Sequence, residues 1–198
     1  MVAIRCLVLA LLLGACVRSG DVGRRDAAVT AIQVATIADV RPSPTAETVQ
    51  EAIVRIARSQ VGTMEVGGNN CGPGPKKYLA SVGLPEGYPY CAAGLYWCYR
   101  EAGVRLPGGK GQYARAAHWS QDDLRLSSFD SARVADVCGY YYASLRRIGH
   151  VELFVSATPS QVRVIGFNTT NGISRDGEGV FEKIILRKQV TCVARHIQ

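Results

Sequence analysis

The feature that most restricts the fold is a change of sequence pattern near residue 134. Before it, apolar residues recur at helical spacing between glycine stops, and after it segments rich in β-branched and aromatic residues follow one another. Asn171-Gly172 and Asp176-Gly177 are typical of the tight turns that join antiparallel strands. Helices followed by such strands predict an α+β domain, with N-terminal helices packed on a C-terminal antiparallel sheet. The expected strands are residues 134–143, 151–156, 162–167, 180–186 and 190–196.

Helices are expected in the first half of this domain. The first carries an apolar stripe from Val49 to Ala57, with Ser43 or Thr45 as its N-terminal cap and Gly62 as its end. Proline and glycine signals bound the later helices. These are residues 75–82, 91–102 and 112–119.

The N-terminus is typical of an exported protein. Arg5 is followed by an apolar run over residues 6–13, too short to span a bilayer, and then by Leu13-Gly14-Ala15-Cys16. Those four residues resemble the lipobox of bacterial lipoproteins, in which the cysteine becomes the lipidated first residue; ordinary cleavage with an incidental Cys16 is the alternative. We therefore expect a membrane-anchored lipoprotein of the cell envelope. Its parts are a signal peptide over 1–15, a tether over 16–44 and one domain over 45–198.

The basic charge of the chain indicates which kinds of partner it suits. The formal net charge is +7, with no block of lysine or arginine and no interleaving of basic and aromatic residues. This distribution favours a solvated basic surface over nucleic-acid binding. A basic domain also suits a polyanionic cell wall or a membrane surface.

The cysteine count suggests one reactive thiol. Five cysteines remain once Cys6 is removed with the signal and Cys16 is lipidated. In an oxidising compartment an odd number indicates one free thiol. If Cys91 is that thiol, the other four either form two disulfides or stay as buried thiols, and the sequence does not decide between these. They are Cys71, Cys98, Cys138 and Cys192.

Cys91 is the candidate nucleophile because of where it stands. It follows a loop closed by Pro89 and opens an apolar helix, whose N-terminus stabilises a thiolate. Downstream, Gly149-His150 opens a strand and Asn168 ends the next one. Cysteine, histidine and a polar orienting group is the order of a papain-like site. The plainer alternatives are a buried core cysteine, a core histidine and an asparagine that only ends a strand.

Several short motifs stand in one order between residues 53 and 181. They are Gln60-Val61-Gly62, Gly67-Gly68-Asn69-Asn70, Pro89-Tyr90-Cys91-Ala92-Ala93, Gly149-His150-Val151 and Asn168-Thr169. This ordered set resembles the CHAP family, the cysteine, histidine-dependent amidohydrolases and peptidases of the papain-like superfamily. The run from Ser174 to Val180 is similar to a segment of its phage-type and secreted bacterial members.

The resemblance implies both a fold and an activity. It implies a papain-like core, in which the nucleophile helix packs on an antiparallel sheet, and cleavage of amide bonds in peptidoglycan without a cofactor. The bond is either the N-acetylmuramoyl–L-alanine amide or a peptide bond of the stem or cross-bridge. Many members carry a glutamate where this chain has Gly166, which leaves Asn168, two residues later, as the expected orienting group. We expect a monomer with peptidoglycan as its partner.

The sequence offers donors for an oxyanion but gives no sign of a metal site. An oxyanion needs preset hydrogen-bond donors, and the candidates are the backbone N–H of Cys91 and the side chains of Tyr90 and Asn70. Asn70 also suits an ordinary turn. No metal is expected, because residues 176–179 lack the full ligand series of a calcium loop and the cysteines contain no C-x-x-C pair.

One rival of a different class remains. A catalytically inactive wall-binding or interaction domain would keep the fold after losing an orienting residue, and Gly166 in the glutamate position favours it. An ordinary thiol pKa of about 8.5 for Cys91 would support this rival.

Overall fold

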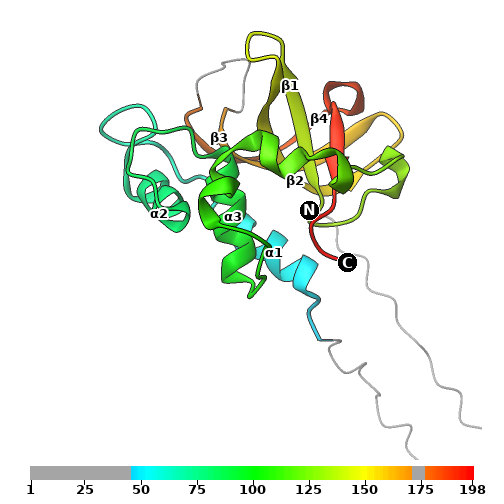
Figure 1. Ribbon diagram of the computed structural model, residues 1–198, viewed down its shortest axis with the longest axis horizontal. Helices are drawn as coiled ribbons and strands as arrows, with labels where there is room; N and C mark the ends of the chain where they lie inside the picture. The colour runs from blue at the N-terminus through cyan, green and yellow to red at the C-terminus, as the bar shows by residue number, and fades with distance from the viewer. Residues whose placement is uncertain (1–45, 171–176) are drawn as a thin grey trace, which may run out of the picture. The chain divides into compact units, whose positions relative to one another are not determined.

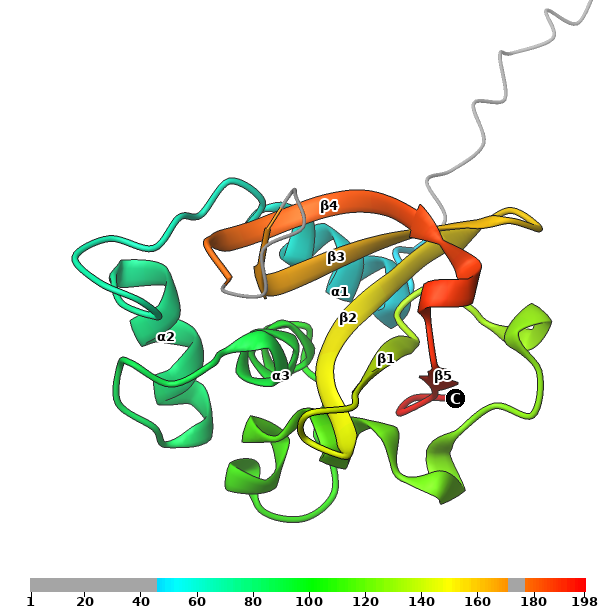
Figure 2. The same cartoon turned by 90° about the horizontal axis from the view of Figure 1, so that it is seen from above.

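The computed structural model describes residues 46–170 and 177–198. Within them, helices (Figure 1) precede an antiparallel sheet whose strands lie in the order β4-β3-β2-β1-β5 (Figure 2). The expected α+β class and the order of helices before strands are confirmed. The elements are α1 (Val49–Arg58), α2 (Pro73–Val82), α3 (Cys91–Glu101), β1 (Val137–Tyr142), β2 (Arg147–Ala157), β3 (Gln161–Thr169), β4 (Gly179–Leu186) and β5 (Cys192–Ala194).

Helix α3 is the centre of the domain. It lies between α2 and the strands β2 and β3, as both views show (Figure 1 and Figure 2). Gly94 allows the close approach, since a Cβ at this position would lie 2.3 Å from Cγ of Phe167 on β3. The fully buried Leu95 and Tyr99 continue the contact into the core. The helix that begins at Cys91 therefore packs on an antiparallel sheet, as the family resemblance implied.

Helix α1 begins later than predicted. Its cap is Thr48, whose hydroxyl accepts the N–H of Glu51 at 3.2 Å, while the Glu51 carboxylate accepts the N–H of Thr48 at 2.8 Å. This reciprocal capping box starts the first turn at Val49. The predicted caps Ser43 and Thr45 lie outside the described residues.

Residues 112–119 do not form the α-helix that was predicted. The chain makes two 3-10 helices instead, Lys110–Ala114 and Ala116–Ser120, with Arg115 in extended conformation between them. The side chain of Trp119 is fully buried, and its indole N–H donates to the carbonyl of Tyr113 at 3.1 Å. Burying this ring favours the broken path over one continuous helix.

The strands also differ from the prediction at their ends. Strand β2 starts at Arg147, so His150 lies within a paired strand opposite Tyr140 and not at its opening. Strand β5 is shorter than predicted and spans only Cys192–Ala194. The turn signal Asn171-Gly172 and the run from Ser174 to Asp176 lie outside the described residues.

The predicted signal peptide, the lipidation site Cys16 and the tether also lie outside the described residues. The chain divides into two units, and Pro44–Gln198 is the unit that contains the sheet. None of the helices in the described part is both long enough and apolar enough to cross a bilayer.

Candidate active site

Cys91 is the first residue of α3, and its side chain is buried. Burial alone would raise the pKa of this thiol. The hydrogen bond and charge of His150, with the backbone N–H groups of Val151 and Ala92, bring the pKa of Cys91 below its ordinary value. The N–H of Ala92 belongs to the first turn of α3, so part of this effect comes from the helix N-terminus on which the sequence prediction relied.

His150 stands between the sulfur of Cys91 and a carboxylate. Its Nε2 lies 3.1 Å from Oε1 of Glu152, which leaves Nδ1 for the hydrogen bond with Cys91. Burial would lower the pKa of the imidazole, but Cys91 and Glu152 together raise the pKa of His150 to about 10. A lowered thiol pKa and a raised imidazole pKa are the two signs of a thiolate–imidazolium pair.

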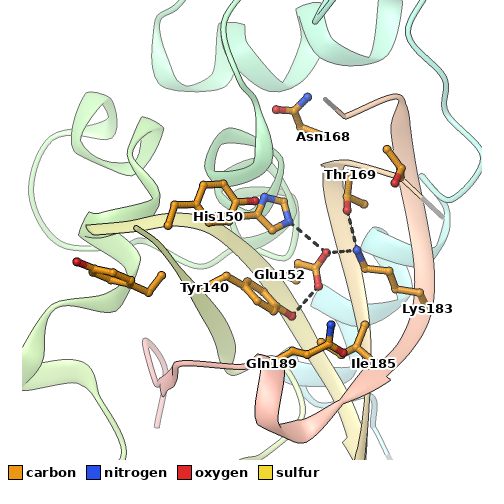
Figure 3. A pocket seen from close by; sticks show the side chains of 11 residues that line it. Tyr140, His150, Glu152, Asn168, Thr169, Lys183, Ile185 and Gln189 are labelled. Carbon is orange, nitrogen blue, oxygen red and sulfur yellow. Dashed lines mark hydrogen bonds and ion pairs between the residues drawn. The ribbon is translucent and has the colours of Figure 1, made fainter. Parts of the chain in front are cut away.

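Glu152 is the third member of this chain of groups, and it was not among the residues predicted from the sequence. Its side chain is 1% exposed and accepts the Tyr140 hydroxyl at 2.6 Å and the Lys183 ammonium at 2.8 Å, in addition to His150 (Figure 3). Burial would raise the pKa of this carboxyl, but His150 and Lys183 lower the pKa of Glu152 to about 2. The carboxylate is therefore ionised at neutral pH.

Gly166 explains why Glu152 occupies this place. The two residues are directly opposed across strands β2 and β3, and a Cβ at Gly166 would lie 2.4 Å from Oε1 of Glu152. The carboxylate thus fills the space that a side chain at position 166 would need. An acidic group is present at the ring after all, but it comes from the strand that carries His150.

A sequence signal for Glu152 did exist. In a strand, residues two apart point to the same face, so His150-Val151-Glu152 places the imidazole and the carboxylate side by side. The predicted strand began at residue 151, and this excluded His150 from the alternation that would have linked the two.

Asn168 is near the site, but its hydrogen bonds do not match the role predicted for it. Its Nδ2 donates to Oδ1 of Asn70 at 2.7 Å and to Oε1 of Glu65 at 3.2 Å, and its Oδ1 accepts the backbone N–H of Tyr90 at 3.3 Å. Among the described residues, the partner of the His150 ring at Nε2 is Glu152. The amide of Asn168 instead ties together the two loops that precede α3.

The two predicted side-chain donors for an oxyanion differ in position. The side chain of Tyr90 is fully buried and stacks on Tyr78 with ring centroids 5.9 Å apart, so the core encloses this ring and it does not line the cleft. Asn70 does line the cleft, and its φ of 58° lies in the left-handed region that asparagine tolerates. Of the two side chains, only that of Asn70 lines the cleft together with Cys91 and His150.

Two small cavities meet at His150 and Asn168. The first, of about 280 Å³, contains Glu152 and Lys183 and is the one drawn in Figure 3. The second, of about 270 Å³, exposes Cys91 and is the place where a substrate can reach the sulfur. Its other lining residues are Asn69, Asn70, Pro89, Tyr142, Leu145, Gly149 and Gly177.

The other cysteines have a different environment. All five in the described part of the chain are free thiols, so none of the disulfides left open by the sequence is formed there. Burial raises the pKa of Cys98 and of Cys138, which keeps both protonated. Within residues 46–170 and 177–198, no group of three or more His, Cys, Asp or Glu side chains could hold a metal ion.

Comparison with known proteins finds similarity only among solved structures. No model of a known protein family and no curated protein matches the chain. An NLP/P60-family protein of Staphylococcus aureus, described as similar to lipoprotein, is 18% identical with a TM-score of 0.44, over 81% of this chain and 45% of that one. The peptidoglycan hydrolase RipB of Mycobacterium tuberculosis is 19% identical with a TM-score of 0.45, over 76% of this chain and 65% of RipB.

A third similar structure is RipD of Mycobacterium tuberculosis, described as a non-catalytic NlpC/p60 domain protein. It is 14% identical with a TM-score of 0.44, over 76% of this chain and 99% of RipD. The chain spans less than two thirds of the staphylococcal protein and of RipB. The staphylococcal protein and RipD are described as NlpC/P60 proteins and none of the three as a CHAP protein, so the resemblance to the CHAP family stays a prediction.

Proposed function

We propose that this chain is a thiol hydrolase that cleaves amide bonds in peptidoglycan. Cys91 is the nucleophile, His150 carries the proton and Glu152 orients the imidazole. The observation that supports this most directly is the position of the His150 ring, buried between the sulfur of Cys91 and the carboxylate of Glu152. Such a chain of groups activates a cysteine because it stabilises the thiolate, which is the attacking species.

The reaction follows from the protonation states. The Cys91 thiolate attacks the carbonyl carbon of the amide, and the carbonyl oxygen becomes an oxyanion that accepts the backbone N–H of Cys91 at the start of α3. As the carbon–nitrogen bond breaks, His150 gives its proton to the leaving amine, and a thioester remains on Cys91. Water then attacks the thioester and gives a proton to His150, which releases the acid and restores the thiolate–imidazolium pair.

The substrate class rests on the sequence motifs and on the character of the cleft. The ordered motifs resemble a family that cleaves peptidoglycan, and besides His150 and Cys91 the cleft is lined by uncharged side chains that suit a peptide backbone. The basic charge of the chain suits a polyanionic wall. Export, the lipid on Cys16 and a monomeric state belong to the same proposal.

The inactive wall-binding domain was favoured by the glycine at position 166. Glu152 removes that argument, because its carboxylate is within 3.1 Å of the ring that the missing residue was expected to orient. An intact chain of ionisable groups favours the hydrolase.

Digestion of purified peptidoglycan tests the proposal. The wild-type chain is compared with Cys91→Ser, and Cys192→Ser is the control because it removes a free thiol on β5, away from the cleft. We expect soluble fragments from the wild type and the control and none from Cys91→Ser, with fragment masses that name the bond. No release from several wall types by folded, reduced protein would favour the binding domain.

A further inference from the structure

We propose that Lys183 is a positioning residue that acts on His150 through Glu152. Its ammonium shares one carboxylate oxygen with the imidazole, so the carboxylate stays charged without holding the imidazolium too tightly. This inference rests on the proposed function in naming the reaction, but the arrangement itself is testable on the protein alone.

Both carboxylate oxygens of Glu152 accept hydrogen bonds or ion pairs. Oε1 of Glu152 receives two cationic groups, Nζ of Lys183 at 2.8 Å and Nε2 of His150 at 3.1 Å, while Oε2 accepts the hydroxyl of Tyr140 at 2.6 Å (Figure 3). Three donors from three strands therefore fix a side chain that is 1% exposed. Both oxygens are occupied, which leaves the carboxylate no freedom to turn away from the ring.

Lys183 is itself held in place. It lies on the edge strand β4, its side chain is 21% exposed, and its Nζ donates to Oγ1 of Thr169 at 2.7 Å. Thr169 follows the irregularity in the pairing of β3 with β4 that begins after Gly166. Gly166, which leaves space for Glu152, thus also precedes the irregularity after which the Thr169 hydroxyl contacts Lys183.

The shared oxygen has a chemical consequence. Burying a carboxylate costs free energy unless the carboxylate is paired with a cation. If His150 were its sole partner, Glu152 would be paired only while the imidazole carried its proton. The reaction needs His150 to lose that proton to the leaving amine. With Lys183 on the same oxygen, Glu152 remains paired when His150 becomes neutral, so proton transfer leaves no unpaired charge in the protein interior.

The titratable groups around Glu152 and His150 come from four elements. Among the described residues, Lys183 is the only lysine or arginine that forms an ion pair with Glu152. Removing the charge of Lys183 makes the buried cluster more negative. Protons then bind the cluster more tightly, and thiolate forms at higher pH. The other groups are Cys138, Tyr140 and Tyr142 on β1, His150 on β2 and Cys91 on α3.

The test is the pH dependence of alkylation of Cys91 by iodoacetamide, followed on the peptide that contains Cys91 by mass spectrometry. In Lys183→Met we expect the midpoint of the rate profile to move to higher pH by about one unit. Lys183→Arg keeps the charge and should restore the wild-type midpoint. Lys188→Met removes an exposed lysine nearby and serves as the matched control.

The outcomes separate this inference from the proposed function. An unchanged midpoint in folded Lys183→Met overturns the role of Lys183, whether or not the wild type digests peptidoglycan. A shifted midpoint in a protein that digests no wall supports the positioning role and contradicts the hydrolase. If Lys183→Met does not fold, Thr169→Val decides, with a smaller shift in the same direction expected and no shift contradicting the inference. In the hydrolase, Lys183→Met should lower kcat more than it changes KM.

Discussion

At the scale of single residues, the site depends on which groups surround a buried sulfur. Cys91 and Cys98 belong to the same helix and are both buried, yet the pKa of Cys98 is raised by burial while that of Cys91 is lowered. The difference is His150, with two backbone N–H groups, beside Cys91 alone. Burial makes the hydrogen bonds of Cys91 count for more, because no water competes for them.

We expect the charge of Glu152 to be the residue-scale feature that most affects turnover. We expect Glu152→Gln to lower kcat/KM for peptidoglycan by on the order of 10²-fold, because the amide keeps the shape but supplies no negative charge to the imidazolium. Steady-state digestion kinetics measure this. Glu182→Gln, on β4 and paired with Arg58, is the control and should stay near wild type. Equal losses in both variants would contradict the role of Glu152.

Glu152 also predicts a dependence of stability on acid. Its pKa falls from 4.5 in the unfolded chain to about 2 in the fold, mainly through His150 and Lys183 acting against burial. A depressed carboxyl pKa stabilises the fold above the unfolded value, and this contribution is lost as the pH falls through the folded value. Urea unfolding between pH 5 and pH 2 should therefore show a steeper loss of unfolding free energy in the wild type than in Glu152→Gln. Parallel curves would contradict this.

At the scale of elements, two close approaches build the site. Gly94 allows α3 to pack closely against Phe167, and Gly166 leaves space for the Glu152 side chain between β2 and β3. The sequence predicted α3, its first residue and the strands, because apolar period and glycine stops report local structure. It missed Glu152, because the predicted strand began after His150 and so left out the alternation that places the two side chains on one face. The space that Gly166 leaves across the sheet depends on strand pairing, which no local pattern shows.

A methyl group at position 166 should therefore affect both stability and activity. In Gly166→Ala the new Cβ would lie 2.4 Å from the Glu152 carboxylate, so the carboxylate must move away from the ring. We expect a loss of about 1–3 kcal/mol in unfolding free energy, measured in urea. Digestion of peptidoglycan should fall about tenfold or more. Gly109→Ala, where a Cβ meets nothing within 4 Å, is the control and should change neither.

At the scale of the whole molecule, the basic charge adds a property that the site does not have. The chain carries a net charge of +7, and such a charge attracts a protein to polyanionic surfaces over distances that salt shortens. The charge could be counted from the sequence, but the partner it serves depends on the proposed substrate.

Salt should separate the two contributions. We expect digestion of whole peptidoglycan sacculi carrying anionic polymers to slow several-fold as salt rises from low to about physiological ionic strength. Digestion of a short, uncharged amide substrate should change little, since the cleft is lined mainly by uncharged side chains. Equal salt dependence for both substrates would show that the surface charge does not guide the chain to the wall.

In the resting protein, we expect His150 to stabilise the thiolate of Cys91. A titration of thiolate absorbance in the ultraviolet, taken as the difference between the wild type and Cys91→Ser, tests it most directly. We expect the Cys91 thiolate to form at a lower pH than the thiolate of an ordinary cysteine, because the pKa of Cys91 is lowered and that of His150 is raised to about 10. A thiolate that forms only at about pH 8.5 or above, as in an ordinary thiol, would contradict it.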